Sequence, residues 1–94
     1  MSYNSVIVTT SPTKILSSPV DGASRKSAIV TNFTILTSGT SGAVYIGFNN
    51  SVNPANGFPL NQYDIWETNE PRCYQGDLWG VAGSNIDVRY EEIL

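Results

Sequence analysis

The sequence predicts an all-β fold: a small antiparallel β-sandwich, jelly-roll-like, of roughly eight short strands. Apolar and polar residues alternate with a period of two along most of the chain. Short β-branched runs recur at a spacing of about 8–12 residues, and clusters of Gly, Pro and Asn separate them. The 94 residues can bury only a small core, so we expect residues 1–94 to form one domain.

The first half of the chain contains four predicted strands. Residues 4–10 and 13–17 are apolar, β-branched runs that Pro12 separates, and the pairs Ser18-Pro19 and Asp21-Gly22 end the second run. Residues 25–36 alternate over a longer stretch, and residues 43–48 return after a segment that contains two glycines. Two runs with such a connection are typical of a β-hairpin, so we expect these two strands to pair.

The second half contains four more. The asparagine-rich segment 49–57 is a loop by composition, residues 58–60 form a short edge strand, and residues 62–68 end before Pro71. Residues 78–82 and 86–90 flank a three-residue connection, which predicts a second hairpin. Only residues 90–94 could end in a turn of helix.

Residues 1–10 have two possible roles. They could serve as an N-terminal arm that adds a strand to a neighbouring molecule, or as an ordinary first strand of their own sandwich. The predicted core consists of alternating aliphatic residues on the strands, namely Ile7, Ile15, Ile29, Val44, Ile46, Leu78, Val81, Ile86 and Val88.

The composition argues against several chemistries. The chain has no His and a single cysteine, Cys73, which we expect to be a small buried hydrophobe. A disulfide framework, a Cys/His zinc site and an imidazole base are therefore excluded. Asp64 and Glu67 are three apart and would face opposite sides of a strand, so they cannot act as a carboxylate pair. We expect no catalytic residue, no metal ligand and no cofactor: the protein is not an enzyme.

The charge balance also limits the partners. The net charge is −3, from 5 basic and 8 acidic residues, and only 14% of residues are charged. This balance is unlike the basic surface of a nucleic-acid-binding protein. No apolar run approaches the roughly 20 residues of a membrane span, and the N-terminus lacks the pattern of a signal peptide. We expect a cytosolic product that binds neither nucleic acid nor membrane.

Aromatic and asparagine residues are the candidates for partner contacts. A surface that has few Lys and Glu residues but exposes aromatic side chains resembles the centre of a protein interface. Trp66 shares a strand face with Asp64 and Thr68, and we expect that face to point to solvent. The predicted partner-binding residues are Tyr3, Asn49, Asn50, Asn53, Asn56, Phe58, Tyr63 and Trp66.

The order of motifs resembles a small all-β domain of tailed-bacteriophage virion proteins, of the capsid-decoration (cement) or fibre-base type. One segment departs from the pattern, because Asn32 is followed by Phe33 rather than by a tight Asn-x-Gly turn. The motifs that carry the resemblance are Val8-Thr9-Thr10-x-x-Thr13-x-Ile15-Leu16, Arg25-Lys26-x-Ala28-Ile29-Val30-x-Asn32, Val44-Tyr45-Ile46-Gly47, Gly57-Phe58-Pro59-Leu60, Leu78-Trp79-Gly80-Val81-Ala82-Gly83 and Val88-Arg89-Tyr90-Glu91.

This resemblance implies a structural virion protein that is made in the host cytoplasm, binds the capsid shell and stabilises it. Its expected partners are the major capsid protein or other virion proteins, together with further copies of itself in a homo-oligomer. The alternative is a head- or tail-fibre base, or a module that binds a receptor or a glycan, with Tyr63, Trp66 and the 49–57 loop as its platform.

Overall fold

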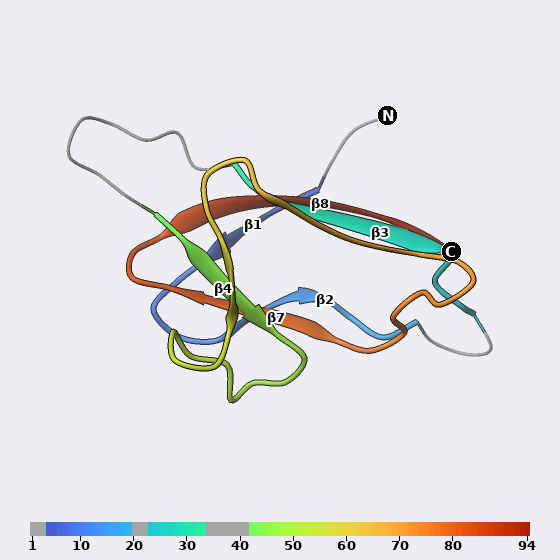
Figure 1. The fold of residues 1–94 in the computed structure, drawn as a ribbon, viewed down its shortest axis with the longest axis horizontal. Helices are drawn as coiled ribbons and strands as arrows, with labels where there is room; N and C mark the ends of the chain where they lie inside the picture. Colours follow the sequence, from blue (N-terminus) through green and yellow to red (C-terminus); the bar gives the residue numbers. More distant parts are fainter. Residues whose placement is uncertain (1–3, 20–22, 34–41) are drawn as a thin grey trace.

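The structure, a computed structural model, describes residues 4–19, 23–33 and 42–94. Every regular element in these ranges is a β-strand, which confirms the all-β prediction (Figure 1). None of the three ranges contains a helix of the length and apolarity needed to cross a membrane. The strands are β1 (Asn4–Val8), β2 (Thr13–Leu16), β3 (Ser27–Asn32), β4 (Val44–Gly47), β5 (Phe58–Leu60), β6 (Ile65–Asn69), β7 (Leu78–Ala82) and β8 (Ile86–Ile93).

The strands form two four-stranded sheets, with the orders β1-β8-β3-β6 and β2-β7-β4-β5. All neighbouring strands run antiparallel. Except for β4 and β5, consecutive strands lie in opposite sheets. Within the sheets, β1 lies beside β8 and β2 lies beside β7. This is the strand order of a jelly roll, and it confirms the predicted sandwich.

Both predicted hairpins are wrong, because each pair of strands is divided between the two sheets. β3 pairs with β6 and β8, whereas β4 pairs with β5 and β7. The same division separates β7 from β8, so their short connection crosses from one sheet to the other. Residues 90–94, which could have ended in a turn of helix, do not form one. β8 continues to Ile93, which lies opposite Ser27 and accepts a hydrogen bond from the main chain of Lys26 at 2.6 Å.

The core lies between the sheets and follows the alternation of each strand. On β3 the inward side chains are Ala28, Val30 and Asn32, all of which are buried. Of the predicted core residues, the buried ones are Ile15, Val44, Ile46, Leu78, Val81, Ile86 and Val88.

Two core predictions fail. Ile7 is 51% exposed, and Ile29 is only half-buried. β1 turns Val8 inward, so the intervening Ile7 points outward opposite Asp87. Ile29 faces out in the same way, between two inward residues of β3. Residues 4–8 thus form a strand of the chain's own sheet, while Tyr3 lies outside the described residues.

Candidate binding groove

A groove of about 430 Å³ opens at the side of the sandwich where both sheets end, between the edge strands β5 and β6. Its size is within the usual range of about 300–1,000 Å³ for ligand pockets. Among the described residues, none of the lining side chains is an acid or a base. The lining residues are Ile46, Gly47, Phe48, Asn49, Val52, Asn56, Phe58 and Trp66.

Trp66 forms the β6 side of the groove. It lies opposite Val30 and therefore on the inner face of its sheet, where it packs against the core. The expectation that the Trp66 face points to solvent is therefore wrong. The outward residues of β6 are Ile65, Glu67 and Asn69, all exposed.

Phe58 forms the opposite side. It lies on β5, a strand of only three residues, in register with Ile46 of β4. Because β5 is the last strand of its sheet, no further strand in the described part of the chain covers Phe58, which remains 61% exposed. An aromatic side chain held open in this way is available to a ligand.

The 49–57 loop closes the third side, and hydrogen bonds from its own asparagines hold its shape. Asn49 Oδ1 accepts from the main chain of Ser51 at 2.9 Å, and Asn53 Oδ1 accepts from Ala55 at 2.8 Å. Asn56 Oδ1 accepts a hydrogen bond from the main-chain N–H of Asn53 at 2.8 Å. Asn56 Nδ2 donates to the main-chain oxygen of Ser51. These contacts are typical of Asx turns, so Asn53 and Asn56 act first as parts of the loop.

Val52 fastens this loop to the sheet. It is 5% exposed, and its side chain fills the space over two glycines. A Cβ atom at Gly47 would lie 2.8 Å from Val52 Cγ2, and one at Gly57 would lie 3.0 Å from the same atom. Glycine is needed at both positions because the loop approaches the strands so closely.

Tyr74 supports the groove from behind. Its ring lies 4.5 Å from that of Phe48 and 6.3 Å from that of Trp66, in the second case edge-on. Its hydroxyl donates to the main-chain oxygen of Asp77 at 2.6 Å. Burial, and secondarily the negative charge of Asp77, raise the pKa of the Tyr74 phenol, so it remains a hydrogen-bond donor at neutral pH.

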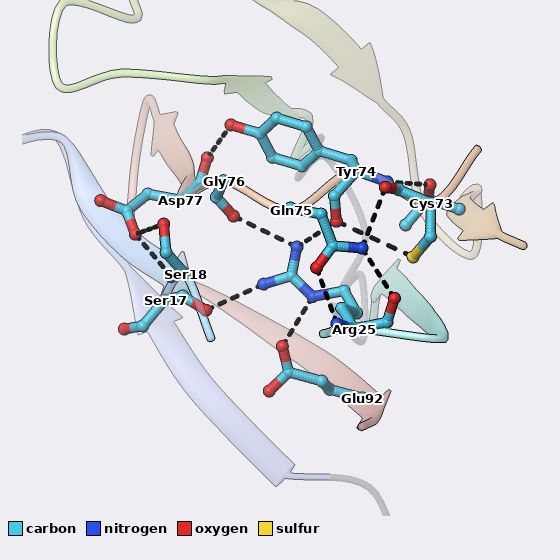
Figure 2. Close-up of polar contacts among 10 residues, drawn as sticks. Ser17, Ser18, Arg25, Cys73, Tyr74, Gln75, Gly76, Asp77 and Glu92 are labelled. Atoms are coloured by element: carbon cyan, nitrogen blue, oxygen red, sulfur yellow. Dashed lines mark hydrogen bonds and ion pairs between the residues drawn. The ribbon is translucent and has the colours of Figure 1, made fainter. Parts of the chain in front are cut away.

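Arg25 holds the main chain around Tyr74 in place (Figure 2). Its side chain is fully buried and donates four hydrogen bonds. Nη1 donates to the main-chain oxygens of Tyr74 at 2.6 Å and Gly76 at 3.2 Å, and Nη2 donates to that of Ser17 at 2.8 Å. Nε forms an ion pair with Glu92 Oε2 at 2.6 Å. One cation therefore joins four separate segments at this end of the sandwich.

The main chain of Arg25 takes part as well. Its N–H donates to Gln75 Oε1 and its carbonyl oxygen accepts from Gln75 Nε2, both at 2.7 Å (Figure 2). Nearby, the main-chain N–H and hydroxyl of Ser18 donate to Asp77 at 2.7 and 3.1 Å. These two hydrogen bonds, with a smaller contribution from Lys14, hold the pKa of Asp77 below its usual value.

A second exposed feature lies on the outer face of the β1-β8-β3-β6 sheet. We call it the outer-sheet patch; it consists of Ile7, Phe33, Tyr63, Ile65 and Arg89. The rings of Phe33 and Tyr63 meet edge-on at 5.9 Å, and the Arg89 guanidinium lies 4.5 Å from the Phe33 ring centre. Ile7, Tyr63 and Ile65 are each more than half exposed.

Two contacts fix the geometry of this patch. Asp87 accepts from Arg89 at 2.9–3.1 Å, which raises the pKa of Arg89 and orients its guanidinium. Tyr63 has a φ of 65°, in the left-handed region, where the N–H of Tyr63 donates to the Asn32 carbonyl oxygen at 2.7 Å. The tertiary structure therefore sets the unusual backbone that presents Tyr63.

The predicted contact residues divide between these features. The groove brings together Asn49, Asn56, Phe58 and Trp66. Tyr63 belongs to the outer-sheet patch, and Asn50 and Asn53 are exposed in the 49–57 loop without lining the groove. Tyr3 lies outside the described residues.

Sequence reasoning did not find the roles of Phe48, Val52 and Arg25. Phe48 directly precedes the predicted 49–57 loop and Val52 lies within it. Their position next to the predicted contact asparagines could therefore have identified them. Nothing in the Arg25-Lys26 pair distinguishes a buried arginine from a surface one. Cys73 is half-buried, and its thiol has a long contact of 3.8 Å with the Tyr74 carbonyl oxygen.

The described residues contain no group of three or more Cys, Asp or Glu side chains able to hold a metal ion. Comparison of the chain with protein-family models, with curated proteins and with solved structures found no match.

Proposed function

We propose that this protein is a structural component of a tailed-bacteriophage virion that binds the capsid shell and stabilises it, as a decoration or cement protein. The observation that carries the proposal is the outer-sheet patch. It combines Phe, Tyr, Ile and Arg side chains on a rigid sheet, and aromatic residues and Arg are enriched at the centres of protein interfaces. The resemblance of the strand motifs to small virion proteins supports the same function.

The patch suits docking energetically. Its aromatic rings are already held against each other and against Arg89, so less side-chain entropy is lost on binding. Asp87 already neutralises Arg89, so the guanidinium needs no new counter-ion when it is covered. The surrounding surface is rich in Ser, Thr and Asn, whose burial costs less than that of Lys or Glu.

A chain of this size offers only a modest contact area, near the roughly 800 Å² per partner of a standard interface. We infer that the protein self-associates and binds a repeating lattice, because multivalency raises affinity without a larger interface. In this proposal it is made in the host cytoplasm and resides on the virion surface.

The test is binding to purified shells that lack the protein. Tyr63→Asn combined with Phe33→Ser removes both rings, and Asn tolerates the left-handed backbone at position 63. We expect shell affinity to fall by about tenfold or more, as for a truncated hot spot. Thr10→Ala, an exposed position in the β1–β2 connection, is the control. A folded double variant that binds as the wild type does would contradict the proposal.

The rival function is a fibre-base, receptor-binding or glycan-binding module. The groove favours it, because three aromatic side chains and Asn49 surround a space in which the described lining residues carry no charge. Copy number separates the two functions. Quantitative gels of purified particles should show hundreds of copies of a cement protein, but only a few or a few dozen copies of a fibre component.

A further inference from the structure

Among the described residues, β6 is an open sheet edge. It pairs with β3 on one side and is the last strand of its sheet on the other. The hydrogen bonds Asn32 N to Asp64 O and Glu70 N to Lys26 O show that the even-numbered residues of this segment bond to β3. In an antiparallel ladder, the intervening residues direct their main-chain groups to the other side.

The free main-chain groups therefore belong to Ile65, Glu67 and Asn69. Outside the strand ladder, no hydrogen bond among the described residues involves the main-chain N–H or C=O groups of these three positions. Such a row of donors and acceptors is a template for another strand, and only a polypeptide main chain matches its spacing.

The groove lies beside this same edge. Trp66, the inward residue between Ile65 and Glu67, lines it, and Phe58 on the edge of the other sheet faces it. Because side chains alternate along a strand, a segment added to β6 would direct every second side chain into the groove. The uncharged, largely apolar lining selects an apolar side chain there.

The carboxylates on the outer face of the sheet determine which side chains the added segment should carry on that face. Glu67 is exposed in the middle of the edge, and no ion pair within the described parts of the chain involves it. Glu91 lies on the same outer face, separated from Glu67 by Ile29 of the intervening strand. Its Oε2 atom is buried and has no hydrogen-bond donor among the described residues. Lys or Arg next to Glu67 would be favourable here.

A second copy of β6 does not fit this edge. An antiparallel pair of β6 strands centred on Glu67 would place two glutamates opposite each other, and like charges in that position are destabilising. The occupant is therefore a segment of different sequence.

We propose that β6 binds an extended segment of another virion protein by strand addition, with an apolar side chain in the groove and Lys or Arg beside Glu67. The identity of the partner as a virion protein rests on the proposed function. The binding mode rests on the β6 edge and the groove alone.

The first experiment removes a main-chain donor from the edge. Glu67→Pro deletes an N–H that β3 does not use, and proline is tolerated on the outer side of an edge strand. Glu67→Ala removes the same charge and keeps the N–H, so it is the matched control. On shells lacking the protein, we expect Glu67→Pro to bind about tenfold more weakly than Glu67→Ala, a difference of about 1.4 kcal/mol. Equal binding by two folded variants would overturn the inference.

The second experiment needs no shell. The peptide used is eight residues of alternating valine and lysine; its control carries N-methyl groups on every second amide. We expect the unmodified peptide to slow amide exchange at Ile65, Glu67 and Asn69, and the methylated peptide to leave these amides unchanged. Protection elsewhere, or protection by both peptides, would overturn strand addition. If the wild type does not bind shells but this protection occurs, the proposed function fails and the binding mode stands.

The third experiment addresses the groove. Phe58→Ser changes an exposed side chain on the groove wall, and we expect it to weaken peptide binding without lowering the melting temperature. Displacement of the peptide by neutral saccharides would identify the groove as a glycan site and contradict the proposal.

Discussion

The Nη1 atom of Arg25 donates a 2.6 Å hydrogen bond to the main-chain oxygen of Tyr74 (Figure 2). The ring of the same Tyr74 contacts Phe48 and Trp66, which line the groove. A buried guanidinium at one end of the sandwich therefore positions an exposed binding feature. This contact is one of those that couple the stability of the fold to the shape of the groove.

Replacement of Arg25 should be strongly destabilising. Arg25→Ala leaves three main-chain carbonyl oxygens and the partly exposed Glu92 carboxylate without their donor, and a buried acceptor left unpaired costs about 1–3 kcal/mol. Arg25→Lys should recover little, because an ammonium cannot reproduce the planar set of donors. Urea denaturation measures the free energy of unfolding of both variants. Arg72 is exposed, so Arg72→Ala is the control and should change that free energy by no more than about 0.5 kcal/mol. A small effect of Arg25→Ala would contradict the role of the network.

Stability should depend on pH through Asp77. Its pKa in the folded state is lowered, chiefly by the hydrogen bonds from Ser18, so the carboxylate stabilises the fold above its ordinary pKa of 3.8. This contribution is lost as pH falls through the lowered folded pKa. The wild type should therefore be more stable than Asp77→Asn at neutral pH, and thermal melts should show the difference shrinking below about pH 4. A difference independent of pH would contradict this assignment.

Close packing of Gly47 against Val52 predicts a coupled pair of mutations. A methyl group at position 47 would lie 2.8 Å from Val52 Cγ2, so Gly47→Ala should cost about 1–3 kcal/mol by overpacking. Combining it with Val52→Ala should cost less than the sum of the two single changes, in a double-mutant cycle of unfolding free energies. Gly83→Ala is the control, since no atom of the described residues lies within 4 Å of a Cβ there. Strict additivity would show that the loop moves away freely.

Metal removal should leave the fold unchanged. Carboxylates are the side chains that bind calcium, and Asp87 accepts three hydrogen-bond contacts from Arg89 through both of its oxygens. A cation there would have to displace the guanidinium. The melting temperature should be the same with and without excess EDTA, and a clear decrease after chelation would reveal an oxygen-ligand site.

The sequence by itself determined the strands, because their evidence is local. Period-two alternation and the Gly, Pro and Asn breaks place eight strands close to where they occur, and alternation also identifies most of the core. The composition likewise limits the chemistry, since missing residue types cannot be supplied by folding.

Only the tertiary structure decided the pairing of the strands and the role of several side chains. Gly83-Ser84-Asn85 satisfies the local rules for a hairpin, yet β7 and β8 lie in different sheets, because β7 pairs with β2 and β4 whereas β8 pairs with β1 and β3. Alternation divides β1 and β6 into two faces without saying which is inward, so Ile7 and Trp66 were assigned to the wrong sides. Arg25 is buried because three other segments, at Ser17, residues 74–76 and Glu92, meet around it, and contacts between separate segments leave no pattern in the neighbouring residues.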